Sequence, residues 1–429
     1  MPAFCGIDVG LKTHAVCLLD SEGRILEEFT ITNDRTGFEG LTSRLSRMTK
    51  CALEPTGVYS INLYLYLKQR KYDARFVDTR SSSHFRKALN RNQKADRKDA
   101  VALAKYRIVY EDLTRDGTPF LDRMFSQPKS EAQRELSRLA FQNRVLSAEV
   151  RQVKTRIKRL IDLRFPEAGQ LYKDRASVMV CRVLSHSKKD VLCGRVPKVP
   201  ARIIECVRGT IGQFDLHRDD FCNLVQQHKE LDHALNECET QVLERVRQVG
   251  YESMLGLACV GPVTAATLIT EALPVSRFIR TRPGNGLIDK RASLRAFKSY
   301  CGLGVTRDQS GMHEGGQKLS RGGNLRLKSV LFTMARGMLS IRPAQVQEYD
   351  HTPLRPSKYQ GMFARYRDQG KKGMWAIVKM MDKIATDLFF ILRDLEHDQV
   401  SRAASGTNQS MPRTAPRLVE EPVLQTTSP

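Results

Sequence analysis

The hydrophobic and polar positions of the first roughly 110 residues alternate between a strand pattern and a helix pattern. Three short segments with strand character come first and are joined by polar turns: FCGIDVG (4–10), HAVCLLD (14–20) and RILEEFTI (24–31). Helix and strand patterns then follow in turn: a helix near 35–48, the strand KCALEP (50–55), the helix YSINLYLYLKQR (59–70), the strand ARFVDT (74–79) and helical material over 82–112. This pattern predicts an α/β domain built on one sheet.

Three strands followed by alternating helices and strands is the element order of a ribonuclease H-like fold. Other α/β folds share parts of this order, so the order alone is a weak signal. We therefore expect a ribonuclease H-like N-terminal domain and look for further support in its polar residues.

Beyond residue 130 the pattern changes to long helices with apolar positions three and four residues apart. The first series is Leu136, Leu139, Asn143, Leu146, Val150, Val153, Ile157 and Leu160, and the second is Phe221, Leu224, His228, Leu231, Leu235, Cys238 and Val242. Sustained heptads with charges between them are typical of coiled-coil helices. The sequence leaves open whether they pair within one chain or between chains. The polar members Asn143 and His228 are interpreted as devices that fix the register.

The C-terminal part is also predicted to be mainly helical. In LACVGPVTAATLITEA (257–272) a glycine turn precedes a helix of small residues. It is either a place where backbone N–H groups face a phosphate or an ordinary helix start with Pro262 in the first position. The stretch TRDQSGMHEGGQKLSRGGN (306–324) is almost devoid of apolar residues, and its composition predicts a glycine-rich loop between two helices. After a last helix near 373–396, the chain becomes rich in Pro, Ser and Thr, which predicts disorder.

The formal net charge of the 429 residues is +23, which predicts a polyanionic partner. The excess is concentrated in residues 281–380, which carry 19 Lys and Arg against 6 Asp and Glu. Nucleic acid fits this charge better than an anionic membrane, because no basic amphipathic helix stands out. Ten cysteines occur without a C-x-x-C pair, so neither a zinc site nor a disulfide framework is expected. No apolar run reaches spanning length and no signal peptide is recognised, so we expect a cytoplasmic protein.

Four acidic residues occupy positions that suit metal binding. Asp8 lies in the first strand, Glu54 ends the strand KCALEP, and Asp96 and Asp99 are three residues apart at a helix start. Taken singly, each has a structural interpretation: a turn cap, a strand-end charge, or acids that suit a helix N-terminus. Taken together, on a basic chain with this element order, they favour a site for Mg²⁺, or for Mn²⁺ in its place.

At these residues the chain resembles the DEDD-type insertion-sequence transposases related to the Piv DNA invertase, also known as bridge-RNA-guided serine recombinases. The segments GIDVGLKTHAV, ALEPTG and KADRKDA resemble the three acidic segments of that family in order and spacing. The segments ACVGPVTAATLI, YCGL, QSG and KLSRGGNLRLK resemble its C-terminal transposase domain. One departure is Cys259, which stands where the family usually has a glycine.

The resemblance implies that Asp8, Glu54, Asp96 and Asp99 bind the metal and that Ser310 is the covalent nucleophile. It also implies a homo-oligomer, either a dimer or a tetramer, whose composite site takes acids from one protomer and the serine from another. A structured non-coding guide RNA would pair with the DNA of the element ends and of the target. The element patterns and the resemblance together predict four regions: a RuvC-like catalytic domain (1–125), a helical coiled-coil region (126–250), a transposase domain with a helix-hairpin-helix-like element (251–398) and a disordered tail (399–429).

Metal ions can activate a phosphodiester toward a serine, so no local His–Asp pair is needed. His313 is three residues from Ser310 but is interpreted as incidental, and Ser320 is interpreted as a helix cap or phosphate contact rather than the nucleophile. Candidate contacts to nucleic acid are Gly261, Arg307, Gly311, Lys318, Ser320, Arg321, Asn324, Arg326 and Lys328. Each single basic residue also has an ordinary interpretation as solvated loop charge.

The predicted function is therefore that of a DNA transposase or recombinase that breaks and rejoins DNA through a serine. Two alternatives stay open at this stage. One is a metal-dependent, junction-resolving nuclease that hydrolyses DNA without a covalent intermediate. The other is a basic nucleic-acid-binding protein without catalysis, in which the acids are structural.

Overall fold

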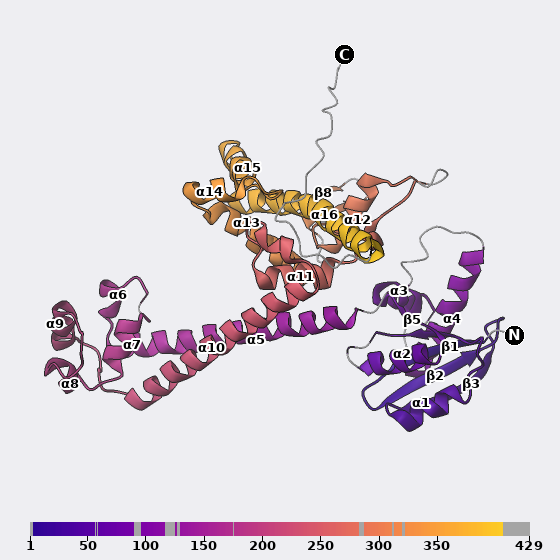
Figure 1. The fold of residues 1–429 in the computed structure, drawn as a ribbon, viewed down its shortest axis with the longest axis horizontal. Helices are drawn as coiled ribbons and strands as arrows, with labels where there is room; N and C mark the ends of the chain where they lie inside the picture. The colour runs from indigo at the N-terminus through magenta and orange to yellow at the C-terminus, as the bar shows by residue number, and fades with distance from the viewer. Residues whose placement is uncertain are drawn as a thin grey trace, which may run out of the picture. The chain divides into compact units, whose positions relative to one another are not determined.

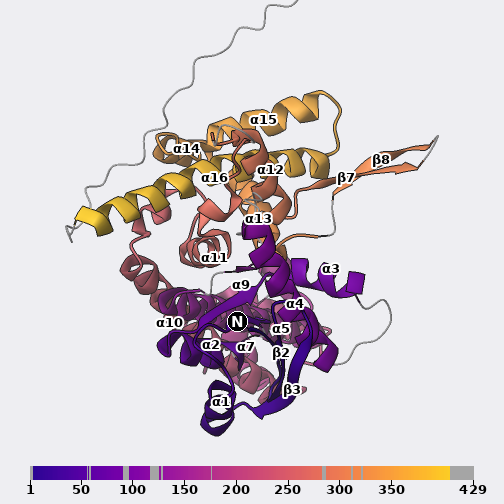
Figure 2. The same ribbon diagram turned by 90° about the vertical axis from the view of Figure 1, so that its right-hand side faces the viewer.

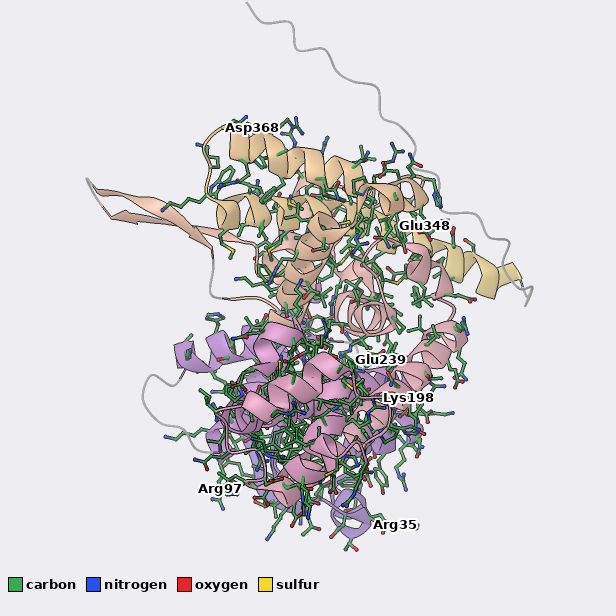
Figure 3. The ribbon with its side chains drawn as sticks, turned by 90° about the vertical axis from the view of Figure 1, so that its left-hand side faces the viewer. Arg35, Arg97, Lys198, Glu239, Glu348 and Asp368 are labelled. Atoms are coloured by element: carbon green, nitrogen blue, oxygen red, sulfur yellow. The ribbon has the colours of Figure 1, made fainter. Side chains whose placement is uncertain are left out.

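The computed structural model describes residues 3–55, 57, 59–89, 96–115, 125–126, 129–174, 176–282, 287–310, 313–319 and 322–405. The chain divides into two compact units, Met1–Ser130 and Glu131–Pro429. Charged side chains such as Arg35, Glu239 and Asp368 lie on the outside of these units (Figure 3). No described helix has both the length and the apolar character that a bilayer crossing requires.

The N-terminal unit contains a six-stranded sheet in the order β3-β2-β1-β4-β5-β6 (Figure 1). Its strands are β1 (Phe4–Val9), β2 (Thr13–Leu19), β3 (Ile25–Thr32), β4 (Lys50–Leu53), β5 (Asp73–Val77) and β6 (Phe125–Ser126). Strands β1 to β3 are antiparallel neighbours, β4 and β5 run parallel to β1, and β6 pairs antiparallel with β5. The sheet predicted from the alternating pattern is confirmed for the first five strands.

Helices cover both faces of this sheet. The helices of the unit are α1 (Arg35–Thr42), α2 (Tyr59–Gln69), α3 (Thr79–Leu89) and α4 (Asp96–Arg115). Cys5, Ile7 and Val9 of β1 pack in one core with α1 and α2, whereas Phe4 packs in another with Ala100 and Ala104 of α4. Because strand side chains alternate between faces, Gly6 and Asp8 belong to the α4 face.

The second unit is organised around two long helices, α5 (Glu131–Arg164) and α10 (Arg218–Gln248). They pack side by side in opposite directions, since Leu136 near the start of α5 shares a core with Val246 near the end of α10. The thiol of Cys238 lies 3.6 Å from the carbonyl oxygen of Leu139. The predicted coiled-coil helices therefore pair within one chain (Figure 1).

A small helical cluster closes the far end of the α5–α10 pair. It consists of α6 (Ala168–Leu171), α7 (Val178–Leu184), α8 (Lys188–Leu192) and α9 (Ala201–Gly209). Its core includes Ile157 and Ile161 of α5 and Phe221 of α10. The buried guanidinium of Arg164 donates to the carbonyl oxygens of Phe214 and Leu184, which ties the cluster to the end of α5.

The remaining helices pack against the other end of the pair. They are the short 3-10 turns η2 (Glu252–Gly256) and η3 (Val275–Phe278), and the helices α11 (Pro262–Ala272), α12 (Lys290–Tyr300), α13 (Leu325–Ser340), α14 (Pro343–Tyr349), α15 (Pro356–Asp368) and α16 (Gly373–Ser405). One hydrophobic core joins these elements with the start of α5 and the end of α10. The domain boundaries predicted within this unit stay predictions.

The glycine-rich stretch between α12 and α13 forms strands, so the loop predicted there is wrong. Strands β7 (Val305–Ser310) and β8 (His313–Leu319) form a two-stranded antiparallel ribbon that projects from the helices (Figure 2). A ribbon of this kind is held by the backbone hydrogen bonds between its strands. It therefore needs no alternating apolar pattern, which is the signal that the sequence lacks.

Candidate active site

The first two acids, Asp8 and Glu54, lie at the same edge of the sheet. Asp8 is in β1 and Glu54 directly follows β4, and these parallel strands pair with Ile7 opposite Leu53. The residues that follow Ile7 and Leu53 are the acids Asp8 and Glu54. The backbone N–H of Glu54 donates to the carbonyl oxygen of Ile7 at 3.3 Å. The carboxyl ends of neighbouring parallel strands are a common place for a functional site.

Helix α4 reaches this edge because β1 has a glycine at position 6. A Cβ atom on Gly6 would collide with the backbone of Ala100 and Ala104, so only glycine lets the helix pack this closely. Asp99 directly precedes Ala100 on the first turns of α4 and is largely buried. Asp96 is the first residue of α4, and its side chain lies outside the described residues.

The guanidinium of Arg86, on α3, binds two of these acids. It donates to both carboxylate oxygens of Glu54, at 3.0 and 3.1 Å, and lies 3.3 Å from a carboxylate oxygen of Asp99. The side chains of Arg86 and Glu54 are each 20% exposed, and that of Asp99 is 15% exposed. Such a bidentate, largely buried pair is a strong charge-assisted contact.

The electrostatics of Arg86 show that a third acid takes part. Burial lowers the pKa of Arg86, but the hydrogen bond to Glu54 and the charges of Glu54, Asp99 and Asp8 outweigh burial and raise that pKa. The carboxylates of Glu54 and Asp99 therefore contact one cationic group, and the charge of Asp8 also acts on it. Nothing in the basic sequence around Arg86 distinguishes it from its neighbours, and sequence analysis missed it.

The donor set of this cluster suits a hard divalent cation, because its ligands are carboxylate oxygens. Within the described side chains, no group of three His, Cys, Asp or Glu residues lies close enough together to hold a metal ion. The carboxylates of Glu54 and Asp99 instead flank the guanidinium of Arg86. The carboxylates of the cluster thus have the chemistry and the charge that bind a divalent metal. In this structure, however, they are spaced around the larger guanidinium of Arg86.

Ser310 is the last residue of β7 and pairs across the ribbon with His313, the first residue of β8. In the same ladder Arg307 pairs with Gln317, and Lys318 pairs with Thr306. The side chains of residues 305–319 lie outside the described residues, as do Gly311, Ser320 and Arg321 as a whole. The backbone therefore places Ser310 at the far end of the strand ladder from the helices.

Asn324, the N-cap of α13, follows the ribbon in the chain. Its side-chain oxygen accepts hydrogen bonds from the backbone N–H groups of Arg326 and Leu327. Its side-chain nitrogen donates to Glu271 at 2.7 Å, and Arg326 donates to the other carboxylate oxygen of Glu271, also at 2.7 Å. These side chains tie the start of α13, the helix that follows the ribbon, to α11, a role that the sequence did not indicate.

The helix start at Gly261 has the geometry of an ordinary N-cap. Gly261 is extended, with φ −82° and ψ 176°, and Pro262 follows at the first position of α11. Two residues earlier, Cys259 has a φ of +60°, in the left-handed region that favours glycine. Cys259 thus has the backbone conformation of a glycine, at the position where the family that the chain resembles usually has one. Lys328 is half-buried in the first turns of α13.

Comparison with known protein families gives two matches. Residues 5–166 match the model of DEDD transposases of the IS110 group, and residues 286–351 match the model of the transposase IS116/IS110/IS902 family. No curated protein matches the chain. The first match contains all four acids, and the second contains the β7–β8 ribbon and Asn324. The chain therefore belongs to the IS110 family of DEDD transposases and is a DNA transposase.

Proposed function

We propose that this transposase breaks and rejoins DNA through Ser310, with Mg²⁺ held by Asp8, Glu54, Asp96 and Asp99. The observation that carries the proposal is that Arg86 binds the carboxylates of Glu54 and Asp99, while the charge of Asp8 also acts on Arg86. Acids brought together from two strand ends and a helix, around a compensating cation, are unusual in a purely structural role, because mutual repulsion opposes their approach.

The topology of the N-terminal unit supports a ribonuclease H-like, RuvC-like assignment. Three antiparallel strands are followed by two strands parallel to the first, with helices on both faces. The acids lie on β1, after β4 and on α4, at one edge of this sheet.

In the proposed site, Arg86 is an exchangeable counter-ion. The guanidinium and a metal would use the same oxygens of Glu54 and Asp99, so metal binding requires Arg86 to leave. A bound divalent cation would draw charge from the scissile phosphate. Arg86 would keep the acids close together before the metal binds, because its charge offsets their repulsion.

The chemical step that we assign to Ser310 is a transesterification. The hydroxyl oxygen attacks phosphorus and forms a serine–phosphate ester with the 5′ end of the cut strand. The bond from phosphorus to the 3′ oxygen breaks, and the serine proton ends on that oxygen. Attack of a 3′ hydroxyl from another strand reverses the step and rejoins DNA without an external energy source.

The family resemblance supports two further parts of the proposal. A structured guide RNA would pair with the element ends and the target, and the concentration of positive charge in residues 281–380 supports binding of such polyanions. The acids and Ser310 belong to different units of the chain. This separation is compatible with the composite site of a homodimer or homotetramer.

The test is a recombination assay with Ser310→Ala and, as its matched control, Ser320→Ala. We expect Ser310→Ala to abolish strand exchange while DNA and RNA binding stay within about twofold of wild type, since no phosphate contact is removed. Ser320→Ala should retain exchange, lowered by no more than the loss of one phosphate contact or helix cap, because Ser310 is still present. Full strand exchange by Ser310→Ala would contradict the assignment. DNA cleavage that persists in Ser310→Ala without any rejoining would favour the hydrolytic nuclease.

A further inference from the structure

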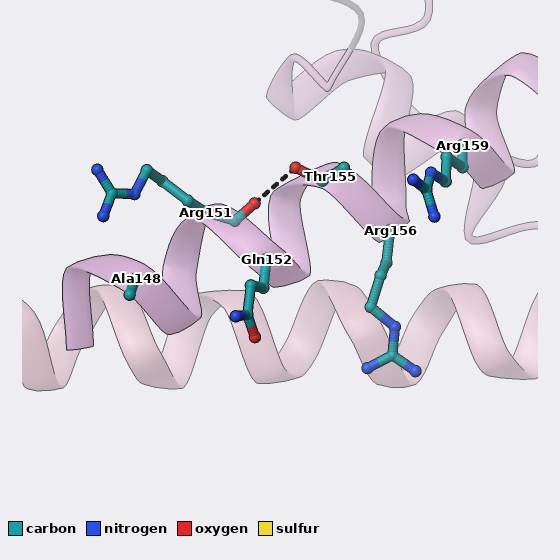
Figure 4. A pocket seen from close by; sticks show the side chains of 6 residues that line it. All are labelled: Ala148, Arg151, Gln152, Thr155, Arg156 and Arg159. Carbon is teal, nitrogen blue, oxygen red and sulfur yellow. Dashed lines mark hydrogen bonds between the residues drawn. The ribbon is translucent and has the colours of Figure 1, made fainter. Parts of the chain in front are cut away.

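A groove on the long helix α5 carries basic side chains that the proposed active site does not use. It is lined by Ala148, Arg151, Gln152, Thr155, Arg156 and Arg159 (Figure 4). These positions are three and four residues apart, so they form one stripe along the helix. Gln152 and Arg156 extend toward the neighbouring helix of the pair.

The three arginines of this groove are exposed and take no part in ion pairs among the described residues. The other basic residues of the same segment differ. Lys154 and Lys158 both bind Asp174, at 2.9 and 3.2 Å. The hydrogen bond from Lys154, ahead of the opposing effect of burial, lowers the pKa of Asp174 to about 2. Two of the basic residues of α5 thus share one acidic partner within the protein, whereas the three arginines of the groove have none among the described residues.

The lining points to an anionic partner rather than to a second copy of the chain. Ala148 is its only apolar member, so little hydrophobic surface is available for helix pairing. In a two-fold dimer the stripe would meet itself, and three arginines would face three arginines. Gln152, between the arginines, can donate hydrogen bonds to phosphate oxygens. The hydroxyl of Thr155 already donates to the carbonyl oxygen of Arg151 at 2.8 Å.

We propose that this groove, which we call the α5 arginine stripe, binds the phosphate backbone of duplex DNA. At 1.5 Å per residue, Arg151 and Arg159 lie about 12 Å apart along the helix axis. One strand of duplex DNA presents a phosphate about every 3.4 Å of its axis, so this length matches roughly three to four phosphates. The stripe lies on α5, a different segment of the chain from those that carry the acids and Ser310. The choice of DNA over RNA rests on the transposase family of the chain.

The test compares two triple variants of the full-length protein that remove the same number of charges. The first is Arg151→Gln, Arg156→Gln and Arg159→Gln. The matched control is Arg35→Gln, Arg138→Gln and Arg195→Gln, whose arginines are also exposed but pair with Glu39, Glu135 and Asp190. Affinity for a mixed-sequence DNA duplex is measured at several salt concentrations, alongside affinity for an RNA duplex and the oligomeric state by sedimentation.

We expect the stripe variant to lose at least about tenfold in DNA affinity and the slope of log K against log salt to fall by about 2 to 3, because each lost phosphate contact removes about 0.9. The control should change both quantities much less. A third variant, Arg151→Lys, Arg156→Lys and Arg159→Lys, should restore the slope. This result separates the loss of positive charge from an effect on folding. Equal losses in both triple variants, a loss confined to RNA, or a changed oligomeric state with unchanged DNA binding would each overturn the proposal.

Discussion

The two halves of the proposed active site are held in different ways. Glu54 and Asp99 are largely buried side chains on a sheet edge and a helix, fixed by core packing and by Arg86. Ser310 ends one strand of a two-stranded ribbon between α12 and α13. A ribbon of two strands has little stability of its own. We infer that the acids are held in place before substrate binds. Ser310, in contrast, takes its final position only when nucleic acid or another protomer binds.

The largest effect that tests this difference is expected for Glu54→Gln. The amide keeps one acceptor for Arg86 but removes a negative charge from the proposed metal site. We expect strand exchange to fall at least about a hundredfold, a typical loss for one preorganised electrostatic group. Glu22→Gln, at an exposed turn, is the control and should retain activity. Normal exchange by Glu54→Gln would show that the acids are structural.

Gly6→Ala tests whether core packing positions the acids. A methyl group at this position would press into the backbone of α4 at Ala100 and Ala104. We expect a loss of about 1–3 kcal/mol or more in the free energy of unfolding, measured by denaturant titration. In α1, a Cβ atom added at Gly40 would enter open space, so Gly40→Ala should leave the free energy of unfolding unchanged or raise it. Equal stabilities of the two variants would refute the close approach of α4 to β1.

Arg86→Ala tests the role of Arg86 as a counter-ion. Without the guanidinium, the carboxylates of Glu54 and Asp99 lose a competitor for metal. We expect Mn²⁺ to bind at least about tenfold more tightly, a change of about 1.4 kcal/mol, as followed by electron paramagnetic resonance. The metal-free variant should also melt at a lower temperature, because the acids repel one another. Weaker Mn²⁺ binding would mean that Arg86 supports the metal site instead of competing with it.

The smallest effect concerns the start of α13, the helix that follows the ribbon. Asn324→Ala removes the N-cap of α13 and the hydrogen bond to Glu271. We expect a cost of about 1–2 kcal/mol in unfolding free energy, typical of a lost cap. Asn324→Asp retains the cap acceptor but places a second carboxylate beside Glu271, so it should recover only part of the stability. An Asn324→Ala protein as stable as wild type would show that this side chain does not stabilise the start of α13.

The sequence predicted much of this architecture, and the failures have physical reasons. Alternating apolar positions identified β1 to β5, but β6 has only two residues and lies far along the chain from its partner. Heptads identified α5 and α10, while their pairing within one chain depends on the helical cluster α6 to α9 that connects them. The β7–β8 ribbon was missed because backbone bonds hold it without an apolar face.

The acids could be proposed from sequence because carboxylates at strand ends stand out in a basic chain. Arg86 and Glu271 could not be found in this way. Each is one charged residue among many, and only the packing of α3 near the acids, or of α11 near α13, gives it a role. Side-chain partners of this kind are tertiary properties that periodicity does not encode.

In the proposed mechanism, DNA is joined covalently to Ser310 during strand exchange. The most direct measurement is to stop the reaction with a denaturant, digest the protein and identify the peptide that carries DNA by mass spectrometry. We predict a 5′-phosphoserine link at Ser310, which is absent from Ser310→Ala and from reactions without a divalent metal. Efficient strand exchange with no protein–DNA link, or with the link at Ser320, would contradict the account.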